Sequence, residues 1–251
     1  MKCNSEENKD YGVNMLNRKL LTDTIEKFGL TVSDEVFYRL DKYAEMLVET
    51  NKSFNLTAIT DADGVTVKHF ADCLSLFGFV DIPENVSLID VGTGAGFPGL
   101  VIKLFRPDID VTFLDSTKKK LGFIENVLNE TGMPGETVHL RAEEAAVLPK
   151  YREKFDFATA RAVAALPVLS EYCLPFVKIG GSFISMKSAD IAEEIKAADG
   201  AIKTLGGETE SDNLFSLVEN MPRRIIVIKK KSQTLTRYPR KTAQIAKKPL
   251  K

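Results

Sequence analysis

The stretch Leu88-Ile89-Asp90-Val91-Gly92-Thr93-Gly94-Ala95-Gly96-Phe97-Pro98-Gly99 decides the fold of this 251-residue chain. An apolar run able to form a buried strand leads directly into a turn with glycine at every second position. Only glycine lets a backbone turn this sharply and pass this close to a ligand. The turn opens a helix predicted over residues 99–105, whose free N–H groups attract a carboxylate or another anion. The stretch therefore predicts a strand, a turn and a helix that bind a nucleoside-containing ligand.

An acidic residue follows at the distance that this kind of turn requires. Asp115 ends a second predicted strand, 19 residues after Gly96, close to the ~20 residues expected for an acid that holds ribose hydroxyls. The glycine spacing is G-x-G-x-G, whereas the pyrophosphate of a dinucleotide needs the longer G-x-G-x-x-G turn. The spacing favours S-adenosylmethionine as the cofactor, with Gly92, Gly94 and Gly96 among the residues that bind it.

Short apolar runs alternate with helical patterns after Pro83, which is typical of βαβ units and a largely parallel sheet. The last run follows a long connection, as the reversed final strand of methyltransferase sheets does. We therefore expect a Rossmann-like α/β fold of the class I methyltransferase type, mostly parallel with a reversed last strand. The expected strands cover residues 86–91, 111–115, 137–140, 155–160, 181–186 and 224–230, and the expected helices 99–105, 118–131, 164–177 and 191–205.

Apolar residues at helical spacing precede the sheet and predict a helical extension. Its helices are expected over residues 15–28, from an N-capping Ser33 to about residue 50, and over residues 63–77. The chain is expected to have four parts: residues 1–14, the helical extension at 15–82, the α/β domain at 83–231 and a basic tail at 232–251. Residues 1–14 are expected to be disordered, because they have few apolar side chains to bury.

The net charge of −1 hides an uneven distribution of charge. The segment from Pro222 to the C-terminus has 11 Lys and Arg and no acidic residue, and the rest of the chain has 23 basic against 35 acidic residues. Such a tail suits RNA, because Lys and Arg pair with phosphates and a tyrosine stacks on an unpaired base. The candidate RNA-binding residues are Arg237, Tyr238, Arg240, Lys241, Lys247 and Lys248.

Several kinds of site are disfavoured by the residues present. The two histidines, His69 and His139, lie near no second ligand at metal-binding spacing, and the three cysteines form no C-x-x-C pair. No apolar stretch is long enough to span a bilayer, and the polar first residues lack a secretory signal. We expect a cytosolic monomer with no metal ion and no membrane partner.

Side chains expected at the carboxyl ends of the strands are the remaining candidates. Arg161 faces the ligand crevice there and could pair with a carboxylate, a phosphate or the Hoogsteen edge of guanine. Lys187 lies on the same rim, where a lysine is more often simply solvated. His69 and Asp72 share one helix face and indicate a capping or orienting pair. The segment Arg141-Ala142-Glu143-Glu144 is either a contact to an adenine edge or an ordinary surface helix start.

These motifs resemble the glucose-inhibited division protein B family, bacterial methyltransferases that modify guanine N7 in 16S ribosomal RNA. The resemblance covers most of the chain, and Pro98 directly after G-x-G-x-G-Phe is its most specific mark. The other marks are Phe54-Asn55-Leu56-Thr57, the 69–72 segment, Leu114-Asp115-Ser116, Arg141-Ala142-Glu143-Glu144, Arg161-Ala162, and the tail segments 237–241 and 247–250. The chain departs from the family at Ala243-Gln244-Ile245, where many members have Gly-x-Pro.

The resemblance implies specific residue roles. Cofactor binding falls on Gly92, Phe97, Asp115, Ala142, Glu143 and Arg161, and Asn55, His69 and Arg141 lie near the acceptor site as candidate catalytic residues. The implied partner is 16S ribosomal RNA or the small ribosomal subunit. Guanine N7 is a lone pair with no proton to remove, so the implied reaction is a direct in-line methyl transfer that needs positioning and no general base.

Two other classes of protein stay open at this point. A nicotinamide-dependent oxidoreductase uses the same βαβ start but has no need of the basic end. A non-catalytic RNA-binding protein of ribosome assembly could keep the fold without the activity, and the segregation of charge suits it as well as it suits an enzyme.

Overall fold

The apolar runs pair into one seven-stranded sheet with strand order β3-β2-β1-β4-β5-β7-β6. The structure is a computed structural model that describes residues 14–251. Strands β1 to β5 pair in parallel, and β7 is antiparallel to both of its neighbours, β5 and β6. The strands are β1 (Ser87–Val91), β2 (Asp110–Asp115), β3 (Glu136–His139), β4 (Phe155–Arg161), β5 (Val177–Ser188), β6 (Gly207–Ser216) and β7 (Pro222–Lys230).

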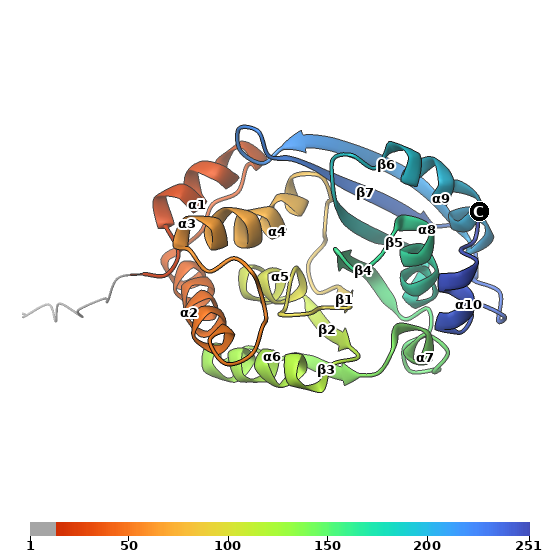
Figure 1. Cartoon of the computed structure of the whole chain (residues 1–251), viewed down its shortest axis with the longest axis horizontal. Coiled ribbons are helices and arrows are strands. Elements are labelled where there is room, and N and C mark those ends of the chain that lie inside the picture. The colour runs from red at the N-terminus through yellow and green to blue at the C-terminus, as the bar shows by residue number, and fades with distance from the viewer. Residues whose placement is uncertain (1–13) are drawn as a thin grey trace, which may run out of the picture.

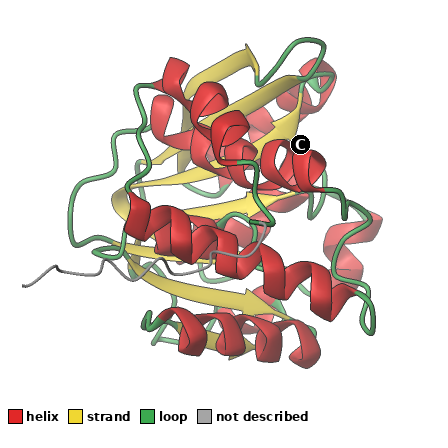
Figure 2. Cartoon of the chain, turned by 90° about the vertical axis from the view of Figure 1, so that its left-hand side faces the viewer, coloured by secondary structure: helices red, strands yellow, loops and turns green. Residues whose placement is uncertain are grey.

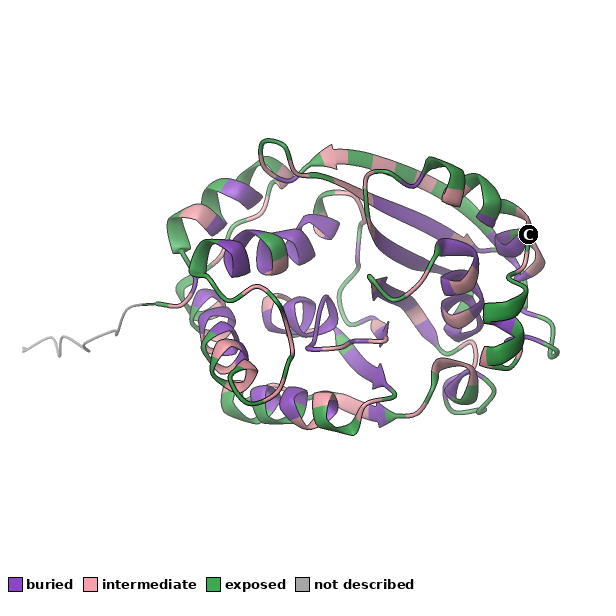
Figure 3. Ribbon diagram, in the orientation of Figure 1, coloured by how far each residue is buried: buried purple, intermediate pink, exposed green. Residues whose placement is uncertain are grey.

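The predicted fold class, a mostly parallel sheet with a reversed last strand, is confirmed. One strand, β6, was not predicted. Its sequence GETESDNLFS is mostly polar, because β6 lies at the edge of the sheet and most of its residues are at least partly exposed. Figure 3 shows this difference between the largely buried central strands and β6, along which exposed and intermediate residues alternate. An edge strand of this kind has no continuous apolar run that a sequence pattern could detect.

One face of the sheet is covered by α5, α6 and the N-terminal helices, which lie at the left and bottom of Figure 1. Figure 2 views the protein from the side of these N-terminal helices. The helical segments of this layer are α1 (Arg18–Ile25) with a 3-10 turn (Glu26–Phe28), α2 (Asp34–Asn51), α3 (Ala62–Val65), a π-helical turn (Thr66–Ala71), α4 (Asp72–Leu74), a 3-10 turn (Ser75–Gly78), α5 (Gly99–Phe105) and α6 (Lys118–Thr131).

The opposite face of the sheet is covered by the helices of the C-terminal half, at the right of Figure 1. They are α7 (Ala142–Ala145), α8 (Leu166–Cys173) with a 3-10 turn (Leu174–Phe176), α9 (Ala192–Thr204) and α10 (Thr242–Lys247). Each face of the sheet thus has its own buried apolar cluster. The carboxyl ends of the parallel strands remain between the two layers, where such folds bind their ligands.

The N-terminal helices differ from their predicted extents for local reasons. Helix α1 begins at Arg18, because the side chain of Asn17 caps it by accepting from the amide of Leu20 at 3.1 Å. Ser33 caps α2 in the same way, as predicted. The third helix, predicted over residues 63–77, is divided by the π-helical turn, which contains His69. Such turns are rare and occur often at functional sites.

The basic C-terminal segment packs against the domain. The guanidinium of Arg152 donates to the carbonyl oxygens of Thr234 (2.7 Å) and Tyr238 (2.9 Å). The side chain of Tyr238 belongs to the second apolar cluster, and Ile245 is buried as well, with 7% and 0% of their surface exposed. The prediction that Tyr238 stacks on an unpaired base does not agree with this burial, because the aromatic ring already packs against the protein.

The helical extension and the α/β domain share one core. Leu40 of α2 and Phe113 of β2 are fully buried and belong to the same apolar cluster. The predicted boundary at residue 82 therefore does not separate two independently packed cores. The expectation of disorder for residues 1–14 falls outside the described residues, apart from Asn14.

A matched pair of leucine substitutions tests this shared core. Leu40→Ala should lower the free energy of unfolding by about 2–5 kcal/mol, because it leaves a cavity in the core. Leu214→Ala, at a side chain on β6 that is 58% exposed, should change it by about 0.5 kcal/mol or less. Urea unfolding followed by circular dichroism measures both. A separate early transition in Leu40→Ala would contradict a common core.

Candidate functional site

The turn after β1 has the backbone that its glycines predicted. Gly92, Gly94 and Gly96 have φ angles of 71°, 60° and 106°, in the left-handed region that side chains disfavour. A Cβ atom on Gly92 would lie 2.8 Å from Cγ2 of Val163. A Cβ atom on Gly96 would lie 2.8 Å from Cβ of Leu100. At these two positions the turn needs glycine for both conformation and space.

Asp90, on the buried strand before the turn, holds the turn in place. Its Oδ2 accepts from the hydroxyl of Thr93 (2.6 Å) and the amide of Gly99 (2.9 Å), and its Oδ1 accepts from the hydroxyl of Thr159 (3.2 Å). Burial raises the pKa of Asp90 to about 6, although these hydrogen bonds act in the opposite direction. We did not single out Asp90 from the sequence. The available signal was a carboxylate inside an apolar strand, which needs buried partners.

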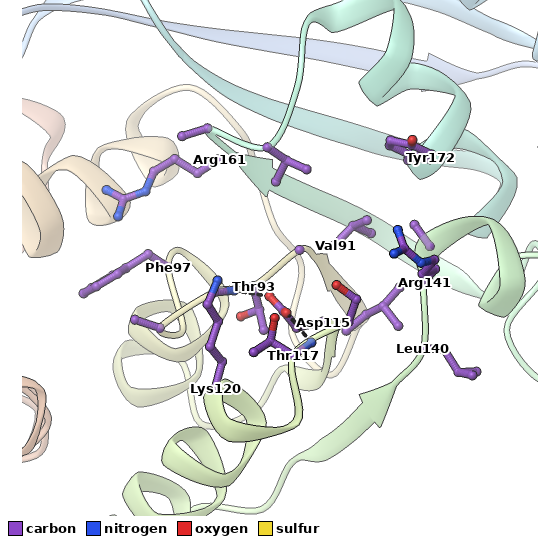
Figure 4. A pocket seen from close by; sticks show the side chains of 18 of the residues that line it. Val91, Thr93, Phe97, Asp115, Thr117, Lys120, Leu140, Arg141, Arg161 and Tyr172 are labelled. Carbon is purple, nitrogen blue, oxygen red and sulfur yellow. Dashed lines mark hydrogen bonds between the residues drawn. The ribbon is translucent and has the colours of Figure 1, made fainter. Parts of the chain in front are cut away.

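The first cavity, of about 530 Å³, lies over this turn and over the ends of β1 and β2. Figure 4 shows Phe97 and Arg161 at one end of it, Arg141 and Tyr172 at the other, and Asp115 between them. The predicted site residues that line this cavity are His69, Gly92, Gly94, Phe97, Asp115, Arg141, Ala142, Glu143 and Arg161. Gly96 is buried below the turn and does not line the cavity.

Asp115 joins the turn to the second strand. Its Oδ2 accepts from the amide of Gly94 (2.9 Å) and its Oδ1 from the amide of Thr117 (2.8 Å). A carboxylate has about four lone-pair sites, so two remain for further donors in the cavity. The two amides fix the orientation of this carboxylate before any ligand binds.

His69 is held as a neutral ring between the helical extension and the turn. Its Nδ1 lies 3.2 Å from Nη2 of Arg161, its Nε2 lies 2.8 Å from the hydroxyl of Thr57, and its ring stacks on Phe97 with centroids 4.5 Å apart. A guanidinium can only donate, so Nδ1 accepts and Nε2 carries the proton. Burial, and then the charge of Arg161, lower the pKa of His69 to about 4.

Arg161 is fixed by contacts on several sides. Its Nη1 donates to Oδ2 of Asp72 (3.1 Å) and to the carbonyl of Lys68 (3.2 Å), and its Cζ lies 4.8 Å from the ring centroid of Phe97. Oδ1 of Asp72 accepts from Nε of Arg223 at 3.0 Å. His69 and Asp72 are therefore connected through Arg161, and not by the direct orienting pair that their spacing indicated.

A second cavity, of about 650 Å³, adjoins the first. Four residues line both cavities: His69, Arg161, Ala162 and Val163. Five basic and two acidic residues line the second cavity: Lys68, Arg161, Lys187, Arg223, Arg224, Asp72 and Glu194. All of the basic groups except Lys68 are paired with carboxylates. The amine of Lys187 lies 2.6 Å from both the carbonyl of Ala164 and Oε1 of Glu194, so it is paired rather than simply solvated.

The structure does not bring the three candidate catalytic residues together. His69 lines both cavities, whereas Arg141 lines only the first, at the end away from Phe97. Asn55 is exposed and lines neither cavity, although its neighbours Leu56 and Thr57 line the first. The three residues that the resemblance places near the acceptor site therefore lie apart from one another, and their catalytic role stays a prediction.

Some residues of the site were given no role by the sequence analysis. Thr57 orients His69 from a loop that is itself held by Oδ1 of Asn51, which accepts from the amide of Thr57 at 2.9 Å. Tyr172 of α8 and Thr242 of α10 line the first cavity from the C-terminal half of the chain. Each depends on a contact between distant segments, which no local pattern records.

Residues 14–251 contain neither a metal-ligand cluster nor a membrane-spanning helix. No group of three or more His, Cys, Asp or Glu gathers there in a way that could hold a metal ion. No helix in this part of the chain has both the length and the apolar character needed to cross a membrane.

The sheet order, the reversed β7 and the ligand cavity over a glycine turn define a class I methyltransferase fold. TrmN from Thermus thermophilus has a similar fold, with a TM-score of 0.50 and 16% identity over 66% of this chain and 53% of that one. The model of the family described as rRNA small subunit methyltransferase G (GidB) matches residues 37–232. This chain belongs to that family.

Curated relatives agree with this membership. A ribosomal RNA small subunit methyltransferase G from Acetivibrio thermocellus is 46% identical over 93% of this chain and 96% of its own length. A protein of the same name from Clostridium novyi is 41% identical over 92% of this chain and 96% of its own length. Membership in a family of methyltransferases argues against the nicotinamide-dependent oxidoreductase that the sequence left open.

The lowered pKa of His69 predicts how stability depends on pH. The unfolded chain takes up a proton near the ordinary value of 6.5, whereas folded His69 does so only near about 4. Stability from the neutral ring is therefore present above pH 6.5 and is lost as the pH falls toward 4. The advantage of wild type over His69→Gln should shrink by about 2 kcal/mol between pH 7 and 5.

Urea unfolding at a series of pH values measures this difference. His139→Gln, at the exposed histidine, serves as the control for loss of a histidine elsewhere. If the curves of wild type and His69→Gln stay parallel down to pH 5, the ring is not held neutral.

Proposed function

We propose that this protein transfers a methyl group from S-adenosylmethionine to N7 of a guanine in 16S ribosomal RNA. The observation that carries the proposal is the meeting of two cavities across His69 and Arg161. One cavity has the glycine turn and acid expected for a nucleoside cofactor, and the other is lined by the exposed Lys68, which suits a phosphate of an RNA strand. The names of the curated relatives support the small-subunit RNA as substrate.

The residues of the first cavity fit S-adenosylmethionine. Gly92 and Gly94 line the cavity without side chains, so a ligand can pass close to their backbone. The free lone pairs of Asp115 suit the two ribose hydroxyls. Glu143, farther along the cavity, can accept from an exocyclic amine of adenine. With the adenine ring at Glu143 and the ribose at Asp115, the methyl group that the cofactor supplies would lie at the opposite end of the cavity, near Phe97 and His69.

Arg161 and His69 act as positioning residues in this proposal. Methylation of N7 removes no proton, so the site needs no general base. Neutral His69 agrees with that requirement, because its Nε2 proton is directed to Thr57 and its Nδ1 accepts from Arg161. A guanidinium fixed by Asp72 and Phe97 can donate to O6 of guanine without reorganising, which leaves the lone pair of N7 free for the methyl group.

Lys68 is the basic group of the second cavity that best suits a phosphate of the acceptor strand, because the others are paired with carboxylates. Lys68 is exposed on the π-helical turn, next to His69. Exposed Arg237, Lys241, Lys247 and Lys248 of the C-terminal segment remain candidates for contacts farther along the RNA. Arg240 is a weaker candidate, because its guanidinium is paired with the buried carboxylate of Glu171.

The first test is transfer of labelled methyl from S-adenosylmethionine to small ribosomal subunits, or to 16S RNA, from cells that lack the modification. We expect the label in 7-methylguanosine after digestion. Arg161→Ala should lower the rate at least about 100-fold, because misplaced reacting groups lose the advantage of orientation. Lys203→Ala, an exposed change on α9, is the control and should retain full activity.

The possible outcomes separate the alternatives. Label in a nucleoside other than 7-methylguanosine would overturn the assignment of the methylated atom. No label in either substrate, with the cofactor bound, would overturn the proposed methylation of ribosomal RNA. It would instead favour either an unknown acceptor or the non-catalytic protein of ribosome assembly.

A second test concerns the RNA-binding role of the second cavity. Lys68→Ala should weaken RNA binding and reduce the slope of log affinity against log salt by about 0.7, the value for one phosphate contact on a single strand. The affinity for S-adenosylhomocysteine should not change, since Lys68 does not line the first cavity. Filter binding at several salt concentrations measures the slope, and an unchanged slope would remove Lys68 from the RNA interface.

A further inference from the structure

The C-terminal helix α10 forms part of the wall of the first cavity. Thr242, its first residue, lines the cavity together with Arg141, Ala142 and Glu143 of the α7 segment and Tyr172 of α8. Figure 4 places Arg141 and Tyr172 at the end of the cavity away from Phe97 and Arg161. The family model matches this chain only as far as residue 232, so Thr242 lies beyond the matched segment.

Thr242 makes a direct contact to a predicted cofactor residue. Its hydroxyl donates a hydrogen bond to Oε1 of Glu143. Glu143 follows Arg141 and Ala142 at the start of α7 and is half-buried. A glutamate side chain has three rotatable torsions, so an isolated one on a surface helix takes many orientations. The hydroxyl of Thr242 selects one of them and leaves Oε2 free to accept from a ligand.

A buried ion pair fixes the position of Thr242. Arg240, two residues earlier, donates from Nε to Oε1 of Glu171 (2.9 Å) and from Nη2 to Oε2 (2.6 Å). Glu171 is fully buried, so this bidentate pair is shielded from solvent. The backbone amide of Arg240 also donates to Oε1 of Glu171, at 2.8 Å. The burial of Tyr238 and Ile245 holds the segment on both sides of Thr242.

We propose that Thr242 positions the carboxylate of Glu143 to read the exocyclic amine of the adenine ring, which makes the C-terminal segment part of the cofactor site. The inference rests on the proposed use of S-adenosylmethionine. A carboxylate only accepts hydrogen bonds, so it favours the amine of adenine and disfavours the carbonyl oxygen that replaces it in hypoxanthine. Selectivity between these two bases therefore reports how firmly Glu143 is held.

The test compares the binding of S-adenosylhomocysteine and S-inosylhomocysteine by calorimetry. Wild type should prefer the adenine compound at least about tenfold, the value of one charge-assisted hydrogen bond. Thr242→Val keeps the shape of the side chain but removes the hydroxyl, and it should reduce this preference about fivefold or more. Thr242→Ser should restore the preference. Gln244→Ala, at an exposed position on the same helix, is the matched control and should leave it unchanged.

The ratio of the two affinities separates positioning from a structural role. A loss of affinity that is equal for both compounds in Thr242→Val would overturn the proposal, since a damaged cavity wall does not distinguish the two bases. An unchanged ratio with unchanged affinities would overturn it as well. If wild type bound neither compound, the proposed cofactor itself would be wrong, and this inference would fall with it.

Discussion

The buried carboxylate of Asp90 is the interaction on which the site depends. It ties the strand, the glycine turn and the first amide of α5 together through Thr93 and Gly99. A charge buried this deeply is unfavourable unless donors surround it, and burial accordingly raises its pKa to about 6. These hydrogen bonds hold the turn tightly bent, and the amide of Gly94 donates to Asp115. A preformed turn of this kind lowers the entropic cost of binding.

A second network connects the helical extension to the sheet. Asp72 of α4 accepts from Arg161 of β4 and from Arg223 of β7, and Arg161 in turn donates to His69. One carboxylate thereby holds two arginines in a largely desolvated place, where an unpaired charge would be costly. The network lies at the junction of the two cavities. The extension therefore contributes to the proposed acceptor site as well as to the core.

The C-terminal segment has two faces with different roles. Its buried side chains and the Arg240–Glu171 pair attach it to α8 and bring Thr242 to the first cavity. Its exposed Lys247 and Lys248 are turned to solvent and remain available to a polyanion. Segregated charge alone predicts only a basic tail, since the sequence of lysines does not indicate whether the backbone is free or packed against the domain. The segment is packed because Arg240 pairs with Glu171, an acid far away in the sequence that needs a partner because it is buried.

The sequence by itself determined the fold class, the reversed last strand and part of the lining of the first cavity. These features depend on local patterns: apolar periodicity, glycine where φ must be positive, and an acid at a set distance from the turn. Only the tertiary structure decided which segments meet. It separated Arg141 from His69, placed Asn55 outside both cavities and brought Thr57 and Thr242 to the first cavity. The physical reason is that contacts between distant segments follow from the packing of whole helices and strands, which no single stretch of sequence encodes.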